Sequence, residues 1–243
     1  ALKDIGHIDV YGSDACLMQM PEVDYEIKDY ADYVVGSEET EPGDGYTYNT
    51  FLAPLAAKPE MSPADLAKTA VDAYMDHYAE QKTGATQSYV KTAALPGLVQ
   101  RVNDWTKAVM AAGLRTEVNN AREIATYYAM DDNKDLYHFV RLLADRTDNA
   151  DVKAKSADLM DYITKDLVQY SRYNDQPASS GGWDDPDEDY APAAAKGYGG
   201  KDYSQSHGIS VYLPGYSMGD GYKDLAWSQA SNWDEFINWY QQK

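Results

Sequence analysis

The sequence predicts an α/β protein with a mostly parallel sheet flanked by helices. Residues 7–11 alternate polar and apolar side chains, as a half-buried strand does, and a glycine and a serine then break the strand. Residues 20–27 follow with helical spacing and residues 31–37 as a second strand, the order of a parallel β-α-β unit. Cys16, the only cysteine, follows the first strand, where α/β enzymes present reactive side chains. We expect the helix to begin near Cys16 and to bring its positive end close to the sulfur.

Composition and charge exclude some classes of protein. Acidic residues number 40 against 21 basic ones, which gives a formal net charge of −19. This charge argues against nucleic acid as a partner, because phosphates need a basic surface. It is compatible with cationic substrates, although solubility in a secreted or cell-envelope setting is the simpler reason for it. Apolar runs are shorter than the roughly 18 residues that suggest a transmembrane helix, so we expect no membrane span.

The next elements are predicted from capping residues and periodicity. Ser62 before a proline starts a helix. Residues 87–93 predict another strand, and residues 95–112 predict another helix, which Gly113 ends. Residues 115–173 show three helical patterns and no strand pattern, so we expect an added helical subdomain there.

The last third of the chain combines a long loop with a late strand. Residues 174–206 are rich in Gly, Pro, Asp and Ala and predict a loop. Residues 208–214 predict a strand that rejoins the sheet, and residues 233–240 predict a final helix. The chain therefore divides into a sheet-bearing part (residues 1–114), the helical subdomain (115–175), an acidic Gly/Pro-rich loop (176–206) and the late strand with the C-terminal helix (207–243).

Three sequence motifs occur in order around the cysteine. They are Asp14-Ala15-Cys16-Leu17-Met18, then Lys28-Asp29-Tyr30-Ala31-Asp32-Tyr33, then Ser37-Glu38-Glu39-Thr40-Glu41-Pro42-Gly43-Asp44-Gly45-Tyr46. In this order the motifs resemble those of the clostripain family, which are caspase-like cysteine peptidases. The resemblance is dense over residues 5–46 and looser further along the chain. It implies a caspase-like fold in which residues 1–114 form the C-terminal part of the catalytic domain.

The same resemblance implies roles for particular side chains. Cys16 would be the nucleophile, and its backbone N–H would help to bind the oxyanion. Asp14 would receive the Arg or Lys side chain that precedes the cleaved bond, since a carboxylate pairs with either cation. Thr40 and Asp44 would complete this substrate pocket. The residues alone leave a plainer alternative open, in which Asp14 accepts local backbone N–H bonds in a turn and Thr40 and Asp44 are polar residues of a loop tip.

A cysteine peptidase needs an imidazole beside its thiol, and the chain has four histidines. His7 is on the first strand, about 30 Å from the thiol if the chain is extended. His77 and His138 lie within helical patterns, and His207 precedes a glycine but follows the cysteine, whereas the family's catalytic histidine comes first. We therefore expect that histidine on a light chain, the N-terminal fragment of the same precursor, with this chain as the heavy chain. Cleavage by the enzyme itself would place Lys or Arg before Ala1.

The other acidic groups have several interpretations. Glu38 and Glu39 would either border the pocket or hold its loop by hydrogen bonds. Residues 131–135 lack the glycine and the final glutamate of an EF-hand loop and so indicate a helix start. Residues 184–189 are more acidic and indicate a solvated loop. We expect no metal site and no cofactor, with calcium left open because some relatives use it.

These expectations define one principal function and one alternative. The principal function is a cysteine endopeptidase of a bacterium, secreted or in its cell envelope or periplasm, that cleaves after Arg or Lys through an acyl-enzyme. Its partners would be the light chain and peptides or proteins with basic residues. The alternative is a non-catalytic binding or scaffold domain of the same fold, in which Cys16 is a buried structural thiol.

Overall fold

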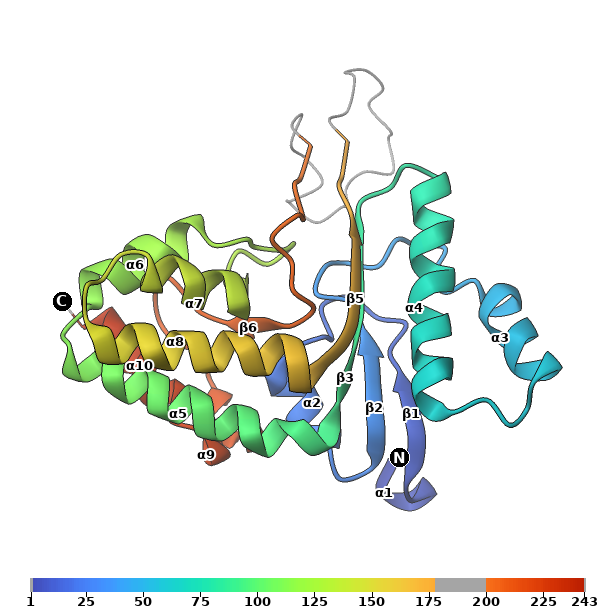
Figure 1. Ribbon diagram of the computed structural model, residues 1–243, viewed down its shortest axis with the longest axis horizontal. Helices are drawn as coiled ribbons and strands as arrows, with labels where there is room; N and C mark the ends of the chain where they lie inside the picture. The colour runs from blue at the N-terminus through green and yellow to red at the C-terminus, as the bar shows by residue number, and fades with distance from the viewer. Residues whose placement is uncertain (1, 178–199, 243) are drawn as a thin grey trace.

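The computed structural model describes residues 2–177 and 200–242, which form a sheet with helices on both faces (Figure 1). Within these residues the main sheet has the strand order β1-β2-β3-β5. The α/β class and the first three predicted strands are confirmed. The bounds of the strands are β1 (Ile8–Gly12), β2 (Ala31–Gly36), β3 (Ala85–Lys91) and β5 (Val168–Asn174).

The sheet is mixed, which corrects the expectation of a mostly parallel one. β1 and β2 run parallel across α2 (Pro21–Ile27), as the β-α-β pattern predicts, but β3 runs antiparallel to both β2 and β5. The path after β2 explains this difference. α3 (Tyr48–Ala57) and its flanking loops lead back along the sheet, and α4 (Pro63–Glu80) then ends beside the loop that leaves β2 (Figure 1). The chain turns from α4 directly into β3, so β3 runs against β2.

The helix α2 begins at Pro21, as the helical spacing of residues 20–27 predicts. Pro21 occupies its first turn, and Met20 is the capping position. The residues between Cys16 and this helix are held in non-helical conformation, because Leu17 and Gln19 donate their N–H groups to the loop after β2. The influence of the positive end of this helix on the thiol stays a prediction.

Helices cover both faces of the sheet (Figure 1). α4 packs on β1, β2, β3 and β5, with α3 on its outer side. Ser62 caps α4 by accepting a hydrogen bond from the Asp65 N–H at 3.1 Å, as predicted. On the other side of the molecule α5 (Leu95–Ala111) packs against α8 (Ala150–Tyr162), and Gly113 follows α5 with a φ of +69°.

The helical part of the chain shares one apolar core with α5. Three helices are present after residue 115 and the last helix is confirmed, but the first of the three ends at Ile124, so Tyr127 and Tyr128 lie outside it although their spacing predicts a helix. Trp105 of α5 is fully buried and stacks on Trp233 near the end of the chain, with ring centroids 6.5 Å apart. The further helices are α6 (Arg115–Ile124), α7 (Leu136–Ala144), α9 (Ala226–Ala230) and α10 (Trp233–Gln241), and the short elements are α1 (Leu2–Ile5), η1 (Thr92–Ala94), η2 (Ile163–Leu167) and η5 (Tyr222–Asp224).

Two strands differ from the sequence prediction. β5 lies inside the part predicted to be helical, because its alternation is carried by tyrosine and arginine and only its first residue is a buried aliphatic. β6 (Ser210–Tyr212) does not rejoin the main sheet and pairs instead with β4 (Asn133–Asp135). Ser210 donates its N–H to Gln19 at 3.0 Å, which draws this segment toward the cysteine turn. The domain boundaries stay predictions, and the acidic residues 184–189 lie outside the described residues.

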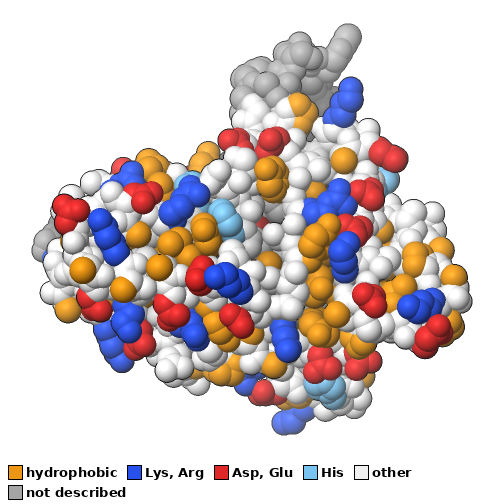
Figure 2. Space-filling model, viewed as in Figure 1, with side chains coloured by type: hydrophobic (Ala, Val, Ile, Leu, Met, Phe, Trp, Pro, Cys, Tyr) orange, Lys and Arg blue, Asp and Glu red, His pale blue; other side chains and the backbone are white. Residues whose placement is uncertain are grey.

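The surface carries charges of both signs. On the face of Figure 2, Lys and Arg side chains are interspersed with Asp and Glu, although acidic residues predominate in the chain as a whole.

Several carboxyl groups are not on the surface at all. Glu22 and Asp24 of α2 are both buried, and Glu22 accepts hydrogen bonds from the Tyr222 hydroxyl at 2.6 Å and from the Tyr212 N–H at 3.2 Å.

We expect the stability of the fold to fall as the pH rises through the titration of Glu22. Burial raises the pKa of this carboxyl from 4.5 to about 7. Between these values the folded state keeps a proton that the unfolded state has lost, so the free energy of unfolding falls by up to about 3 kcal/mol. Glu22→Gln should remove this part of the pH dependence in urea unfolding at about pH 5 and pH 8. The exposed Glu60→Gln is the control, and a Glu22→Gln variant with unchanged pH dependence would contradict the assignment.

Candidate active site

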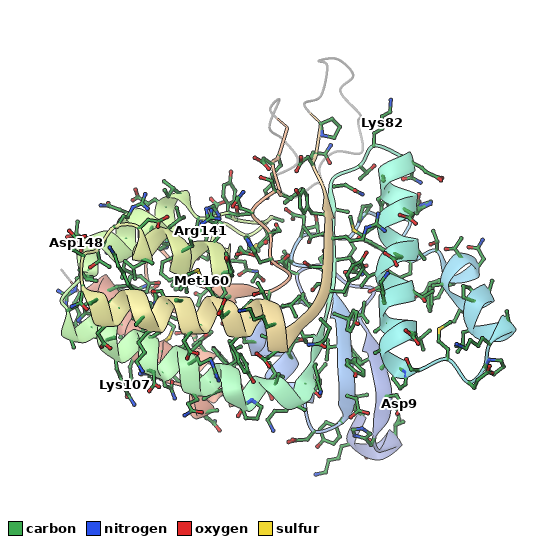
Figure 3. The ribbon with its side chains drawn as sticks, viewed as in Figure 1. Asp9, Lys82, Lys107, Arg141, Asp148 and Met160 are labelled. Carbon is green, nitrogen blue, oxygen red and sulfur yellow. The ribbon has the colours of Figure 1, made fainter. Side chains whose placement is uncertain are left out.

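Cys16 lies on an exposed turn at the carboxyl edge of β1 and β2. This edge faces toward Lys82 in Figure 3, whereas Asp9 on β1 lies near the opposite edge. The Ser13 N–H donates to the Val35 carbonyl at 2.9 Å, which continues the pairing of the two strands beyond β1. The chain then leaves the sheet, and the Cys16 side chain is exposed. The alternative of a buried structural thiol is therefore wrong.

The turn after the cysteine is strained and is fixed by backbone hydrogen bonds. Leu17 has a φ of +62°, a left-handed conformation that costs a non-glycine residue about 1 kcal/mol. Its N–H donates to the Glu39 carbonyl at 3.1 Å, and the Gln19 N–H donates to the Ser37 carbonyl at 3.0 Å. These bonds hold the cysteine turn against the loop that follows β2. Cys16 therefore shares one edge of the sheet with the loop after β2, residues 37–46, which we call the acidic loop.

Two carboxyl groups, those of Asp14 and Glu41, lie close together at this edge. The Cys16 sulfur is 3.9 Å from the Glu41 carbonyl oxygen. Burial, and then the neighbouring Asp14 carboxyl, raise the pKa of Glu41 to about 9. Glu41 is therefore protonated near neutral pH and adds no charge beside Asp14.

Asp14 is exposed and is supported from one side by the acidic loop. Its Oδ2 accepts a hydrogen bond of 2.7 Å from the Tyr48 hydroxyl. Gly45 has a φ of +63°, and a Cβ built on it would lie only 2.8 Å from the Asp14 Oδ1. The carboxylate thus rests on bare backbone at a position where only glycine combines the conformation with the space.

Tyrosines from the loop and from α4 brace this part of the loop. The Tyr46 hydroxyl donates to the Ser13 carbonyl at 3.1 Å and accepts from the Gln87 amide of β3 at 2.6 Å. The Tyr78 hydroxyl of α4 donates to the Gly45 carbonyl at 2.8 Å. The loop under Asp14 is therefore tied to the sheet and to α4 through side chains that, among the described residues, hydrogen-bond to neither Glu38 nor Glu39.

The two other predicted pocket residues, Thr40 and Asp44, lie on the same acidic loop. The Thr40 N–H donates to the Glu39 carboxylate at 2.8 Å. Asp44 is exposed, and burial followed by the Asp44 charge raises the pKa of Tyr78 to about 12, which places Asp44 near the end of α4. The structure thus brings Asp14 and both loop residues to one edge. Contact of any of them with a substrate stays a prediction.

Glu38 points into the protein rather than toward a pocket rim. It is 2% exposed, and its carboxyl accepts hydrogen bonds from the Tyr128 hydroxyl at 2.8 Å and from the Gly208 N–H at 3.2 Å. Burial and then the neighbouring Asp135 raise the pKa of Glu38 well above its usual range. Glu39 is buried as well. Of the two predicted alternatives for these glutamates, the structure therefore shows the one in which they hold the loop.

Three residues of the site were not singled out by the sequence, namely Glu41, Tyr48 and Lys201. Glu41 has a weak signal, because it extends the acidic run of Glu38 and Glu39, and neighbouring like charges raise the pKa of a carboxyl. Tyr48 and Lys201 have none. Their partners, Asp14 and Glu39, lie 34 and 162 positions away in the chain.

The four histidines bind groups other than the thiol. His7 contacts Asp32 at 3.1 Å and His77 contacts Gln81 at 2.9 Å. His138 is buried against the Thr126 hydroxyl at 2.9 Å, and burial lowers its pKa. His207 contacts the Gln205 carbonyl at 2.8 Å and stacks on Tyr137 with centroids 3.9 Å apart. In the part of the chain that the structure describes, no histidine hydrogen-bonds to the Cys16 thiol.

The acidic cluster at residues 131–135 serves the fold. Asp135 caps α7 by accepting from the His138 N–H at 2.6 Å, as the helix-start interpretation predicts. Asp132 accepts from the Gly215 N–H at 3.0 Å and pairs with Arg122 at 3.2 Å. Among residues 2–177 and 200–242, no group of three or more His, Cys, Asp or Glu side chains is arranged to hold a metal ion. None of the helices in these ranges is long and apolar enough to cross a membrane.

Comparison with known proteins identifies a family and a fold. The model of the clostripain family matches residues 1–240 of the chain. No curated protein matches it at a significant level. Several solved structures match, at identities that carry information on the fold alone.

Three solved structures illustrate the likeness. A secreted C11 cysteine protease from Bacteroides thetaiotaomicron is 22% identical with a TM-score of 0.65, and the match covers 96% of this chain and 61% of that protein. A clostripain from the same species, in complex with a peptide inhibitor, is 16% identical with a TM-score of 0.67, and the match covers 94% of this chain and 89% of that protein. A Bacteroides fragilis cysteine protease is 16% identical with a TM-score of 0.60, and the match covers 96% of this chain and 91% of that protein. The caspase-like fold is confirmed, and the chain spans less than two thirds of the first of these proteins.

We expect Gly45→Ala to destabilise the protein and to displace Asp14. The new Cβ meets the Asp14 carboxylate, and the left-handed backbone costs alanine about 1 kcal/mol beyond any clash. Urea unfolding should therefore show a loss of at least about 1 kcal/mol. Gly43→Ala is the matched control, because a Cβ on Gly43 has nothing within 4 Å. Equal stability of the two variants would show that Asp14 does not rest on Gly45.

Proposed function

Because the chain belongs to the clostripain family, we propose that it supplies the nucleophile, Cys16, of a cysteine endopeptidase. The observation that carries this proposal is the exposed thiol on a strained turn, with the exposed carboxylate of Asp14 just before it. Strained residues persist where the surrounding structure holds them, and they cluster at active sites. The location at the carboxyl edge of β1 and β2 leaves the sulfur open to a peptide.

In the proposed reaction the Cys16 thiolate attacks the carbonyl carbon of the scissile peptide bond. The Cys16 N–H binds the developing oxyanion, since the next N–H, that of Leu17, already donates to Glu39. The C–N bond then breaks, and the leaving amine takes a proton from an imidazolium. Water, deprotonated by the same imidazole, attacks the thioester and releases the carboxylate product together with the thiolate.

We propose that this imidazole belongs to a light chain, the N-terminal fragment of the same precursor. The partners of the four histidines described above support this, because none of them is the thiol. A similar structure, with a TM-score of 0.56, is an inactive zymogen of a C11 protease from Parabacteroides distasonis, which supports maturation by cleavage. In this proposal the precursor is cleaved after a Lys or Arg that lies between the catalytic histidine and Cys16. N-terminal sequencing of the mature protein against its precursor tests this point.

The proposed substrates are peptides and proteins with Arg or Lys before the cleaved bond. Asp14 offers an exposed carboxylate that can pair with either cation. Thr40 and Asp44 would border the same pocket. One of the similar structures holds the inhibitor BTN-VLTK-AOMK, whose peptide ends in lysine, and this supports a basic preference.

We further propose that the reaction needs no cofactor and that the enzyme acts outside the cytoplasm. A nucleophilic cysteine with an imidazole completes the chemistry without a metal ion. Calcium stays an open alternative, and a loss of activity on treatment with EDTA that added calcium restores would favour it. One of the similar proteins is secreted, which supports a secreted or cell-envelope location.

We expect Asp14→Asn to impair cleavage after basic residues without unfolding the protein. Loss of the charged partner should lower kcat/KM for a lysyl or arginyl peptide by about 10- to 100-fold, mainly through KM. Asp9→Asn, an exposed substitution at the opposite edge of the sheet, is the matched control. Steady-state kinetics with lysyl, arginyl and neutral peptides measure the effect. Unchanged kinetics of Asp14→Asn on both basic peptides would remove Asp14 from the pocket.

We expect Cys16 to react with a basic affinity probe only when the light chain is present. A lysyl acyloxymethyl ketone should label the co-expressed two-chain protein stoichiometrically, because the probe needs both an activated thiol and the pocket. The isolated chain and the two-chain Cys16→Ala variant should not be labelled. Mass spectrometry of the intact chain measures the adduct. Full labelling of the isolated chain would show that the imidazole is not supplied from outside it.

A further inference from the structure

We propose that the ion pair between Glu39 and Lys201 positions the Cys16 turn. The pair ties the loop after β2 to the segment 201–208, and its loss is expected to lower turnover rather than substrate affinity. This inference rests on the proposed peptidase function of Cys16 and adds two positioning residues to it. Figure 1 shows the segment after residue 200 passing beside β5 on its way to β6.

The Glu39 carboxylate is the fixed centre of this arrangement. It is 4% exposed and, among the described residues, accepts four hydrogen bonds. Such a buried carboxylate keeps its charge only if donors and a cation surround it, so the set of partners determines where the side chain lies. Its donors are the Thr40 N–H at 2.8 Å, the Ala129 N–H at 2.9 Å, the Tyr203 hydroxyl at 2.8 Å and the Lys201 ammonium at 2.7 Å.

The Lys201 ammonium is held by aromatic rings as well as by Glu39. It lies 4.8 Å from the ring centroid of Tyr127, 5.9 Å from that of Tyr128 and 5.5 Å from that of Tyr203. Its side chain is 19% exposed, so these contacts are weakly screened by water. Three rings and a carboxylate thus fix the cation in one place.

The backbone of Lys201 is anchored independently of its side chain. Its N–H and carbonyl form two reciprocal hydrogen bonds with Gln176, each of 2.8 Å. The Gln176 side chain in turn accepts from the Gly84 N–H at 2.9 Å, just ahead of β3. Lys201 is therefore attached to the main sheet, and it holds Glu39 from a rigid base.

Glu39 passes this constraint to the cysteine turn through its own backbone. The Glu39 carbonyl accepts the Leu17 N–H, and Leu17 is the left-handed residue directly after Cys16. A residue in that conformation relaxes toward the commoner regions of backbone space when its restraint is lost. If the Glu39 side chain comes free, the carbonyl can shift, and the Cys16 thiol and N–H lose their orientation together. Misplacement by about 1 Å is enough to slow a reaction by orders of magnitude.

The support of Asp14 is separate, which makes the two effects distinguishable. Asp14 rests on Gly45 and Tyr48, and this part of the loop is tied to β3 and α4. Loss of Lys201 therefore leaves the proposed binding site for the basic side chain in place. A change in kcat with little change in KM is the signature of the positioning role.

The test compares two substitutions of Lys201 in the co-expressed two-chain enzyme. Lys201→Met removes the cation and should lower kcat at least about tenfold, with KM for a lysyl peptide changed less than about twofold. Lys201→Arg keeps a cation that can bind both the carboxylate and the rings, and it should restore most of the kcat. Lys68→Met is the matched control. Lys68 lies on α4 and also pairs with a carboxylate, that of Asp72, and with an aromatic ring, that of Tyr170 on β5. This variant should leave kcat unchanged.

A double variant and a milder variant guard against a general loss of structure. Glu39→Gln combined with Lys201→Met should be no slower than the worse single variant, since both break the same contact. Tyr203→Phe removes one donor without leaving a charge unpaired, so it should fold and show a smaller fall in kcat. Circular dichroism and thermal unfolding establish that each variant is folded at the assay temperature.

A second readout separates failure of this inference from failure of the proposed function. The rate of Cys16 alkylation by iodoacetamide needs no peptidase activity, and it should differ between Lys201→Met and both the wild type and Lys68→Met. If the wild type has no peptidase activity but Lys201→Met still changes the rate of Cys16 alkylation, the proposed function fails and the positioning role stands. An active wild type together with a Lys201→Met variant of unaltered kcat and unaltered alkylation would overturn the positioning role. A rise in KM alone, or an equal loss in Lys201→Arg, would overturn it too.

Discussion

The hydrogen bond from the Leu17 N–H to the Glu39 carbonyl is the contact on which the site depends. It joins the turn that presents Cys16 to the loop that follows β2, and it holds a leucine in a left-handed conformation. The bond is possible because β1 and β2 are parallel neighbours, so both chains leave the sheet at the same edge. Once this contact is made, Asp14 and the acidic loop necessarily lie beside the thiol.

The acidic loop keeps several carboxyl groups out of water, and each is accommodated differently. Glu39 is surrounded by donors and a lysine, whereas burial raises the pKa of Glu41 to about 9. Glu38 accepts hydrogen bonds from the Tyr128 hydroxyl and the Gly208 N–H, and burial and then Asp135 raise its pKa. The common physical reason is that a buried carboxylate must be paired, solvated by protein donors or protonated. The excess of negative charge in the sequence therefore overstates the charge at this edge.

Local patterns were sufficient for much of the fold and for the core of the site. The alternation in β1, the proline after Ser62 and the glycine after α5 each act within a few residues, and the structure has the elements that they predict. β5 and β6 were misjudged for reasons that local patterns cannot reveal. β5 alternates tyrosine and arginine instead of aliphatic residues, and the partner of β6 is the three-residue strand β4, which has no pattern of its own.

The sequence by itself determined the α/β class, the parallel β1-α2-β2 unit, the family and the presence of Cys16 and Asp14 at the end of a strand. These follow from short-range periodicity and from motifs that lie within one stretch of chain. Only the tertiary structure decided that β3 reverses direction and that Lys201 meets Glu39. These depend on contacts between residues far apart in the chain, where burial and the pairing of charges select the partner rather than any local preference.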